Sequence, residues 1–167
     1  MDKLIDDLIK LAFAEDIGDG DHTTLCCIPE TAMGKSQLII KEDGVLAGVE
    51  MAKRIFHDFD PELKMTVFIQ DGAEVKKGDI AFVVEGKIQS LLQTERLMLN
   101  VMQRMSGIAT TTRKYAKALE GTKTHVLDTR KTTPGMRMIE KEAVRIGGGM
   151  NHRIGLFAVS YTHLTLP

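Results

Sequence analysis

The hydrophobic positions in the first half of the chain follow two different periods. After Asp2, apolar residues at positions 4, 5, 8, 9 and 12 recur with helical spacing, which predicts a helix capped by that aspartate. Residues 49–60 repeat this period up to Pro61, whereas the Gly- and Asp-rich residues 15–24 predict a loop. Short apolar runs bounded by turn residues predict four strands, over residues 36–42, 45–48, 64–69 and 80–86. Together these elements predict an α+β module.

The pattern changes at Leu91. Residues 91–105 contain no Gly or Pro and predict a helix, which Ser106-Gly107 should interrupt before a second helix runs to Leu119. From Thr124 the chain shows a short apolar strand, a polar loop, a helical segment over residues 136–146 and a glycine turn at 147–149. This order is the beginning of a parallel βαβ pattern.

Composition narrows the class of protein. The chain has 167 residues, of which 43% are hydrophobic and 27% charged, and its net charge is −1. These values are typical of a globular domain and exclude a disordered chain, a collagen-like repeat and a disulfide scaffold. No apolar run approaches the roughly 20 residues that span a bilayer, and the acidic, amphipathic start is not a secretion signal. Cys26 and Cys27 are adjacent, an unfavourable geometry for a disulfide, so we expect a reducing cytoplasm.

Charge is concentrated in one part of the chain. Residues 128–153 carry six basic and three acidic side chains, a net charge of +3, whereas residues 1–127 are net acidic. A local basic segment in a near-neutral protein indicates an anionic small molecule more than nucleic acid or a membrane. The alternative is a solvated helix face.

Two polar stretches in this basic segment are candidates for chemistry. The sequence DTRKTTPG at residues 128–135 follows a predicted strand, and ligands of α/β folds bind at that end of parallel strands. Arg130 can bind a carboxylate bidentately, and Lys131 adds a second cation. In GGGMNHR at 147–153, the glycines allow a close ligand approach or a sharp turn before Asn151, His152 and Arg153. An exposed loop and a purely structural histidine are the alternatives, and we assign no acid–base role to His152.

Two further features have weaker signals. Arg96, Asn100 and Gln103 form a polar stripe on the predicted helix, either facing a ligand or on its outer surface. The segment 71–87 is similar to half of a lipoyl- or biotinyl-carrier hairpin with Lys87 as the modified residue, although no modification signal surrounds it. The chain contains no phosphate-binding loop and no Cys/His set with zinc spacing.

Taken together, these segments closely resemble the quinolinate phosphoribosyltransferases, also called nicotinate-nucleotide pyrophosphorylases (carboxylating). The resemblance extends from Met1 to about Phe157 and is carried above all by DTRKTTPGMR at 128–137 and GGGMNHRIGL at 147–156. Matching stretches also occur at residues 14–24, 44–48, 71–79 and 95–110.

The resemblance implies an α+β N-terminal module followed by the start of an incomplete α/β (TIM-like) barrel, over residues 1–106 and 107–157. It implies a homodimer or higher assembly that transfers a phosphoribosyl group from phosphoribosyl pyrophosphate, with Mg²⁺, to quinolinate. Loss of CO2 and pyrophosphate gives nicotinate mononucleotide in NAD biosynthesis. The family positions that bind quinolinate match Thr129, Arg130, Lys131, His152 and Arg153, together with Arg96 delivered from the partner subunit.

The chain departs from the family after Leu156. The tail FAVSYTHLTLP carries no Lys, Arg, Asp or Glu, and we expect residues 158–167 to be appended adapter sequence. From Gly107 onwards there is room for about two βα units, so the ligands for metal and phosphate are expected in a missing part and the chain alone should be inactive. The alternatives are a non-catalytic fragment with residual dicarboxylate binding, or a molybdenum-transport-associated paralogue with another substrate.

Overall fold

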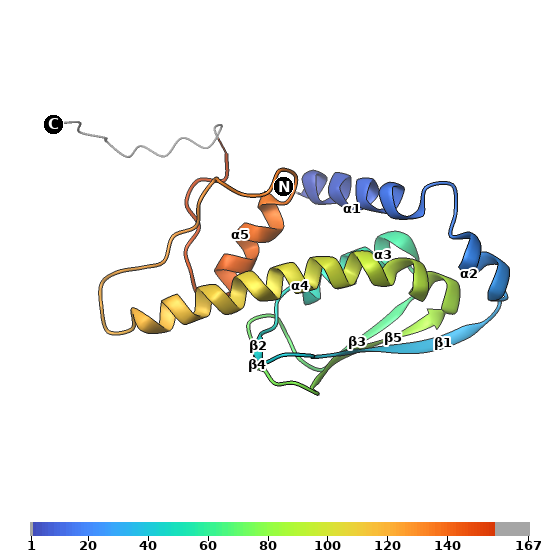
Figure 1. Ribbon diagram of the computed structural model, residues 1–167, viewed down its shortest axis with the longest axis horizontal. Coiled ribbons are helices and arrows are strands. Elements are labelled where there is room, and N and C mark those ends of the chain that lie inside the picture. Colours follow the sequence, from blue (N-terminus) through green and yellow to red (C-terminus); the bar gives the residue numbers. More distant parts are fainter. Residues whose placement is uncertain (1, 156–167) are drawn as a thin grey trace.

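The N-terminal part is built on a small antiparallel sheet. The computed structural model describes residues 2–155, and Figure 1 shows its elements. Strands β1 (Met33–Ile39), β5 (Ile80–Lys87) and β3 (Lys64–Val67) form a sheet in the order β1-β5-β3. The central strand β5 is the most buried because it has a neighbour on each side.

A second, two-stranded sheet completes the β structure. It pairs β2 (Gly44–Val45) with β4 (Glu74–Val75). The four predicted strands are therefore present, with β2 shortened to two residues. Strand β4 was missed because its two residues lie within a turn-rich segment and show no alternation.

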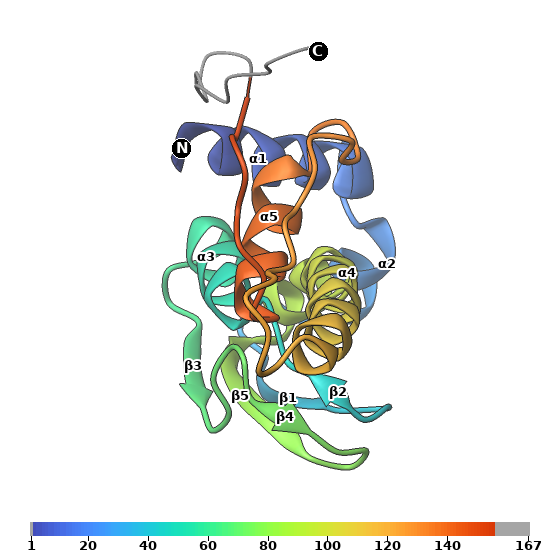
Figure 2. The same ribbon diagram turned by 90° about the vertical axis from the view of Figure 1, so that its left-hand side faces the viewer.

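Helices cover one face of the larger sheet (Figure 2). α1 (Asp2–Ile17) includes Asp2, the residue predicted to cap it from outside. α2 (His22–Cys27) follows after a short turn, so the loop predicted over residues 15–24 is reduced to residues 18–21. The predicted helix at 49–60 is α3 (Val49–Phe59), and its Phe56 packs edge-on against Phe82 of β5 with ring centroids 6.3 Å apart. This aromatic pair joins α3 to the sheet.

The longest element, α4 (Ile88–Ala118), runs the length of the molecule (Figure 1). The predicted interruption at Ser106-Gly107 is wrong. The Ser106 hydroxyl accepts a hydrogen bond from the Ala47 N–H at 3.0 Å and donates to the Ala47 carbonyl at 3.1 Å. Buried Met105 and Ala109 pack on either side of the pair. Tertiary packing thus overrides the weak local breaking tendency, and the predicted boundary at 106/107 lies within a continuous helix.

The C-terminal part begins a barrel. α5 (Arg137–Ile146) packs on α4, and the segments before and after α5 meet in one parallel bridge between Leu127 and Met150. The strand predicted from Thr124 is therefore reduced to this bridge. A parallel strand forms a full ladder of hydrogen bonds only between neighbouring strands. The single β-α-β crossover in the described residues supplies one such neighbour. The fold is an α+β module followed by the start of an α/β barrel, as predicted.

Two further predictions can be compared with the structure. Within residues 2–155 no helix is long and apolar enough to span a membrane. Cys26 and Cys27 are exposed free thiols on α2, as their adjacency predicted.

A hydrogen bond between the end of α3 and the start of α4 yields a pH-dependent prediction. The Ser90 hydroxyl donates to Asp60 Oδ2 at 2.6 Å, and this bond lowers the pKa of Asp60. Asp60 thus stabilises the fold above its unfolded-state pKa, and that contribution is lost as pH falls through the lower, folded-state pKa. In the Ser90→Ala variant we expect the pKa of Asp60 to rise toward its ordinary value, as measured by NMR titration of the carboxyl carbon. The exposed Ser36→Ala is the control, and an unchanged Asp60 titration would contradict the assignment.

Candidate functional site

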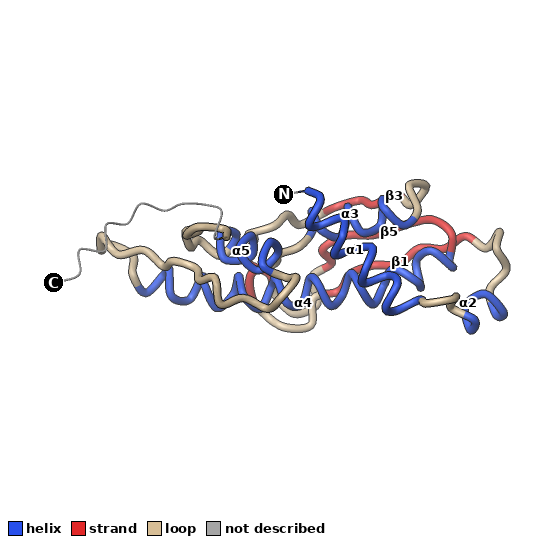
Figure 3. Tube along the Cα trace, turned by 90° about the horizontal axis from the view of Figure 1, so that it is seen from above, coloured by secondary structure: helices blue, strands red, loops and turns tan. Residues whose placement is uncertain are grey.

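The two predicted polar stretches lie side by side at the barrel end of the molecule. The Met150 N–H donates to the Val126 carbonyl at 2.8 Å, and the Asp128 N–H donates to the Met150 carbonyl at 3.1 Å. Seen from above, these loops and α5 occupy the end of the molecule opposite α2 (Figure 3). The parallel bridge thus brings residues 128–131 next to residues 150–153.

A buried ion pair fixes this arrangement. Lys141 Nζ lies 2.6 Å from Asp128 Oδ1, and each side chain is only 3% exposed. The same Oδ1 accepts the His152 N–H at 2.8 Å, and Lys141 Nζ also donates to the His152 carbonyl at 3.3 Å. With its amide oriented to satisfy both ends, Asn151 donates to Asp128 Oδ2 at 2.8 Å and to the Lys141 carbonyl at 2.9 Å. A satisfied network of this kind rigidifies the groups that it joins.

Arg137, one helical turn before Lys141, makes a second connection between the stretches. Its Nε donates to Thr132 Oγ1 at 3.1 Å, and its terminal nitrogens reach the Arg130 carbonyl at 3.5 Å and the Ile154 carbonyl at 3.3 Å. Its contacts with both stretches make α5 a platform for the two loops.

The α4 helix holds the first stretch from the other side. Arg104 Nε donates to Glu140 Oε1 at 2.8 Å, and Arg104 also contacts Thr133 Oγ1. Glu140 is buried, and its other oxygen accepts the Thr133 N–H at 3.3 Å. This contact fixes the end of the DTRKTT loop.

Unlike these connecting residues, the basic side chains predicted to bind a ligand have no partner in the described part of the chain. Within residues 2–155, no hydrogen bond or ion pair engages the side chains of Arg130, Lys131, His152 or Arg153. By contrast, the other basic side chains of the segment, Arg137, Lys141 and Arg145, are all paired. Unpaired cations clustered on a rigid support are suited to neutralising an anion.

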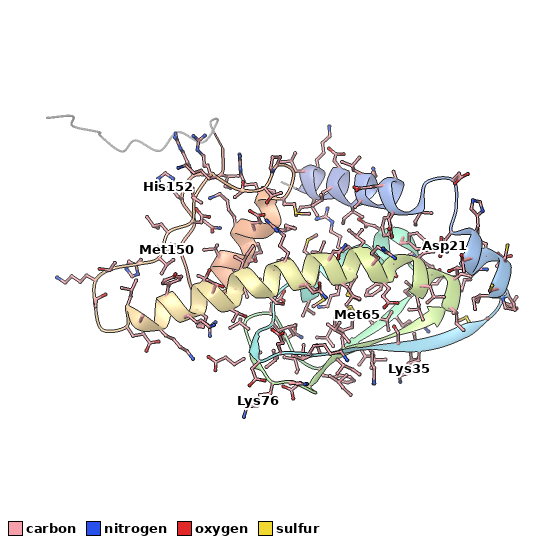
Figure 4. All side chains as sticks on the ribbon, in the orientation of Figure 1. Asp21, Lys35, Met65, Lys76, Met150 and His152 are labelled. Carbon is pink, nitrogen blue, oxygen red and sulfur yellow. The ribbon has the colours of Figure 1, made fainter. Side chains whose placement is uncertain are left out.

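Only some of the predicted residues line a groove. Thr129 and Lys131 lie on the wall of a groove of about 610 Å³ between α4 and the α5 segment, together with Asp128 and Lys141. Thr129 Oγ1 accepts the Lys131 N–H at 3.1 Å and shapes the loop. The side chains of Arg130 and Arg153 are partly buried outside this lining, and that of His152 is exposed on the loop beside α5 (Figure 4).

Arg96 lies elsewhere. Its side chain is 75% exposed near the start of α4, and its Nε lies 3.4 Å from Asp16 Oδ1. Arg96 lines a separate pocket against the α1–α2 turn. The other members of the polar stripe, Asn100 and Gln103, are exposed as well. Within this chain Arg96 does not join the other predicted residues.

The three glycines have structural roles. Gly148 has φ +95°, which makes the sharp turn. A Cβ on Gly147 would lie 2.6 Å from the Ala109 carbonyl oxygen, and a Cβ on Gly149 2.7 Å from the Val144 side chain. The glycines therefore allow a sharp turn and close packing on α4 and α5.

Two other chemical possibilities can be tested against the geometry. No group of three His, Cys, Asp or Glu side chains in residues 2–155 is placed to hold a metal ion. Lys87 ends β5 where α4 begins and lies 3.7 Å from Glu62. A carrier lysine belongs at an exposed hairpin tip, so the geometry does not support the carrier hypothesis.

Comparison with known proteins identifies the family. The N-terminal domain of quinolinate phosphoribosyl transferase matches residues 21–106, and its C-terminal domain matches residues 108–162. The chain belongs to the quinolinate phosphoribosyltransferase family. It is 48% identical over 151 residues to a decarboxylating quinolinate phosphoribosyltransferase of Nicotiana glauca, and 43% identical over 153 residues to a probable nicotinate-nucleotide pyrophosphorylase of Synechocystis.

Solved structures agree with this assignment to the quinolinate phosphoribosyltransferases. NadC from Streptococcus pyogenes superposes with a TM-score of 0.88 at 41% identity and covers 93% of this chain. The nicotinate-nucleotide pyrophosphorylase from Francisella tularensis gives 0.86 at 38% identity and covers 94%. The chain itself spans 55–56% of these two structures. It spans 43% of the Nicotiana protein and 52% of the Synechocystis protein. Residues 158–167, predicted to be appended adapter sequence, lie outside the residues that the structure describes.

Sequence reasoning missed the residues that connect the loops, namely Asp128, Lys141, Arg137, Arg104 and Glu140. One signal was present in the sequence. Arg137, Glu140 and Lys141 have i, i+3 and i+4 spacing, which places their side chains on one face of α5.

Proposed function

We propose that this chain supplies the quinolinate-binding part of an enzyme that transfers a phosphoribosyl group from phosphoribosyl pyrophosphate to the quinolinate ring nitrogen. Pyrophosphate and the 2-carboxylate, as CO2, leave, and nicotinate mononucleotide remains. Relatives named for this activity support the proposal. The observation that carries it is the set of basic side chains without a partner in residues 2–155, Arg130, Lys131, His152 and Arg153, on two joined loops.

The proposed chemistry of the site is charge neutralisation and positioning. Quinolinate carries two adjacent carboxylates on a pyridine ring, so its recognition needs several cations from different directions. Arg130 can form a bidentate pair, and Lys131 and Arg153 add charge. Holding the ring nitrogen still lowers the entropic part of the barrier, and neighbouring cations stabilise negative charge left on the ring as CO2 departs.

The position of Arg96 bears on the assembly of the protein. Arg96 is exposed and remote from the groove of its own chain, which is the placement expected for a residue that completes the site of a second copy. We therefore propose a homodimer or higher assembly acting in the cytoplasm. We also propose that Mg²⁺ accompanies phosphoribosyl pyrophosphate.

Calorimetric titration of the chain with quinolinate and with nicotinate tests the site. Nicotinate has the same ring and only one carboxylate. We expect quinolinate to bind at least about tenfold more tightly, since one additional charged hydrogen-bonded pair contributes on the order of 1.5–3 kcal/mol. Equal affinities, or no binding of either acid, would contradict the proposal.

A second candidate is binding without turnover. It rests on the coverage of the relatives, since the chain spans 43% of the Nicotiana glauca protein and 55% of the Streptococcus pyogenes NadC structure. Incubating the chain with quinolinate, phosphoribosyl pyrophosphate and Mg²⁺ and measuring pyrophosphate release separates the two. Quinolinate binding without release would assign a binding role to this chain, and release would assign catalysis.

A further inference from the structure

The Asp128–Lys141 pair does more than join two loops. Lys141 Nζ donates to the His152 carbonyl at 3.3 Å while Asp128 Oδ1 accepts the His152 N–H at 2.8 Å. Both backbone polar groups of His152 are therefore bound by one ion pair. His152 is one of the predicted binding residues and directly precedes Arg153, and Asp128 stands two residues before Arg130.

The geometry points to a positioning role for Lys141. We infer that the buried Lys141–Asp128 ion pair sets the spacing between the basic side chains of the first loop, Arg130 and Lys131, and those of the second loop, His152 and Arg153. That spacing decides whether two adjacent carboxylates can be bound at once. The inference rests on the proposed function, because it assigns dicarboxylate selectivity to the same site.

The energetics of the pair favour this role over a simple contribution to stability. The cost of removing two charges from water largely offsets their attraction, so a buried ion pair is weak support for a stabilising role. Apolar side chains of similar volume would fill the space between α5 and the loops at comparable stability, but they could not bind both the N–H and the carbonyl of His152. The ion pair therefore fixes the backbone position of His152, which a packed apolar pair would not do.

The net charge of the site supports the same conclusion. Asp128 and Lys141 neutralise each other at 3% exposure each, and Asn151 occupies the other carboxylate oxygen. The pair therefore adds no net charge for a ligand to meet. Any effect of the pair on ligand affinity must act through the position of the neighbouring cations rather than through direct attraction.

The double variant Asp128→Leu/Lys141→Met tests the inference without leaving a buried charge unpaired, and neither new side chain can bind the N–H or the carbonyl of His152. We expect quinolinate affinity to fall about tenfold and nicotinate affinity to change less than twofold, so that the preference for the dicarboxylate disappears. Lys141→Arg keeps the charge and the donors and should retain most of the preference. Lys114→Met, an exposed lysine on α4, is the matched control and should behave as wild type.

Amide hydrogen exchange at His152 supplies a readout that does not depend on quinolinate. We expect the His152 N–H to exchange at least tenfold faster in the double variant, while amides in the middle of α4 keep their protection. If the double variant keeps both the dicarboxylate preference and His152 protection, the inference is overturned.

The two proposals fail differently. If wild type binds neither acid, the proposed function fails, and the positioning inference is then decided by His152 exchange alone. Unchanged protection in the double variant overturns it, and lost protection supports it. If wild type binds quinolinate selectively and the double variant does so equally, only the positioning inference fails.

Discussion

Replacing Arg130 with alanine is expected to lower quinolinate affinity by a factor between about 30 and several thousand. This range corresponds to the roughly 2–5 kcal/mol lost when one partner of a buried hydrogen-bonded charge pair is truncated. The Arg130 guanidinium makes no hydrogen bond or ion pair within residues 2–155, so alanine removes no internal contact of this kind. The loop is bound to Arg137 through the Arg130 carbonyl, which the substitution keeps.

Arg145→Ala is the matched control for Arg130→Ala. Arg145 is an exposed arginine of the same basic segment, and its Nε donates to Glu142 Oε2 at 2.9 Å. This bond lowers the pKa of Glu142, so Arg145 has a partner of its own. Calorimetry with quinolinate should show less than a twofold change for Arg145→Ala. Equal losses in the two variants would mean that general positive charge, rather than Arg130, attracts the ligand.

The sequence signals for the candidate site are local. The loops at 128–135 and 147–153 each contain their basic residues within a few positions, so Arg130, Lys131, His152 and Arg153 could be named from the motifs, and the structure brings the two segments together. The connecting residues depend on tertiary structure instead. Lys141 lies 13 residues from Asp128, and Arg104 lies 36 residues from Glu140. The orientation of α5 decides which basic side chain is buried against which carboxylate. A local sequence pattern does not carry that information.

The fold shows the same division. Apolar runs bounded by turn residues predicted β1, β3 and β5. The helical period predicted α1 and α3, and helical composition predicted α5, each within a few residues. The failures occurred where neighbours far along the chain decide. Ser106 is bound to Ala47, 59 residues away, so α4 passes through a predicted break. The strand after Thr124 has a single parallel partner residue and stays short.

Replacing Gly147 with alanine is expected to destabilise the protein by about 1–3 kcal/mol, the usual cost of overpacking. A Cβ at this position would lie 2.6 Å from the Ala109 carbonyl oxygen and 2.7 Å from Thr112 Cβ. The Ala109 contact is to α4 backbone, so a side-chain rotation cannot relieve it. The φ of Gly147 is −69°, which alanine adopts without strain, so the cost is steric alone. At about 2–4 °C per kcal/mol for a chain of this size, calorimetry should show a lowered melting temperature.

Gly107→Ala makes the same chemical change, but it is expected to raise the stability of the protein instead of lowering it. Gly107 lies within α4, and a Cβ there meets nothing within 4 Å. Alanine should therefore raise stability by about 0.4–1 kcal/mol through helix propensity and a less flexible unfolded chain. If Gly147→Ala melts at or above Gly107→Ala, close packing on α4 is not the reason for the first glycine. If the signs are opposite, Gly147 is required because the end of α5 must approach α4 closely. That approach is what allows the Met150 N–H to reach the Val126 carbonyl and the His152 N–H to reach the Asp128 carboxylate.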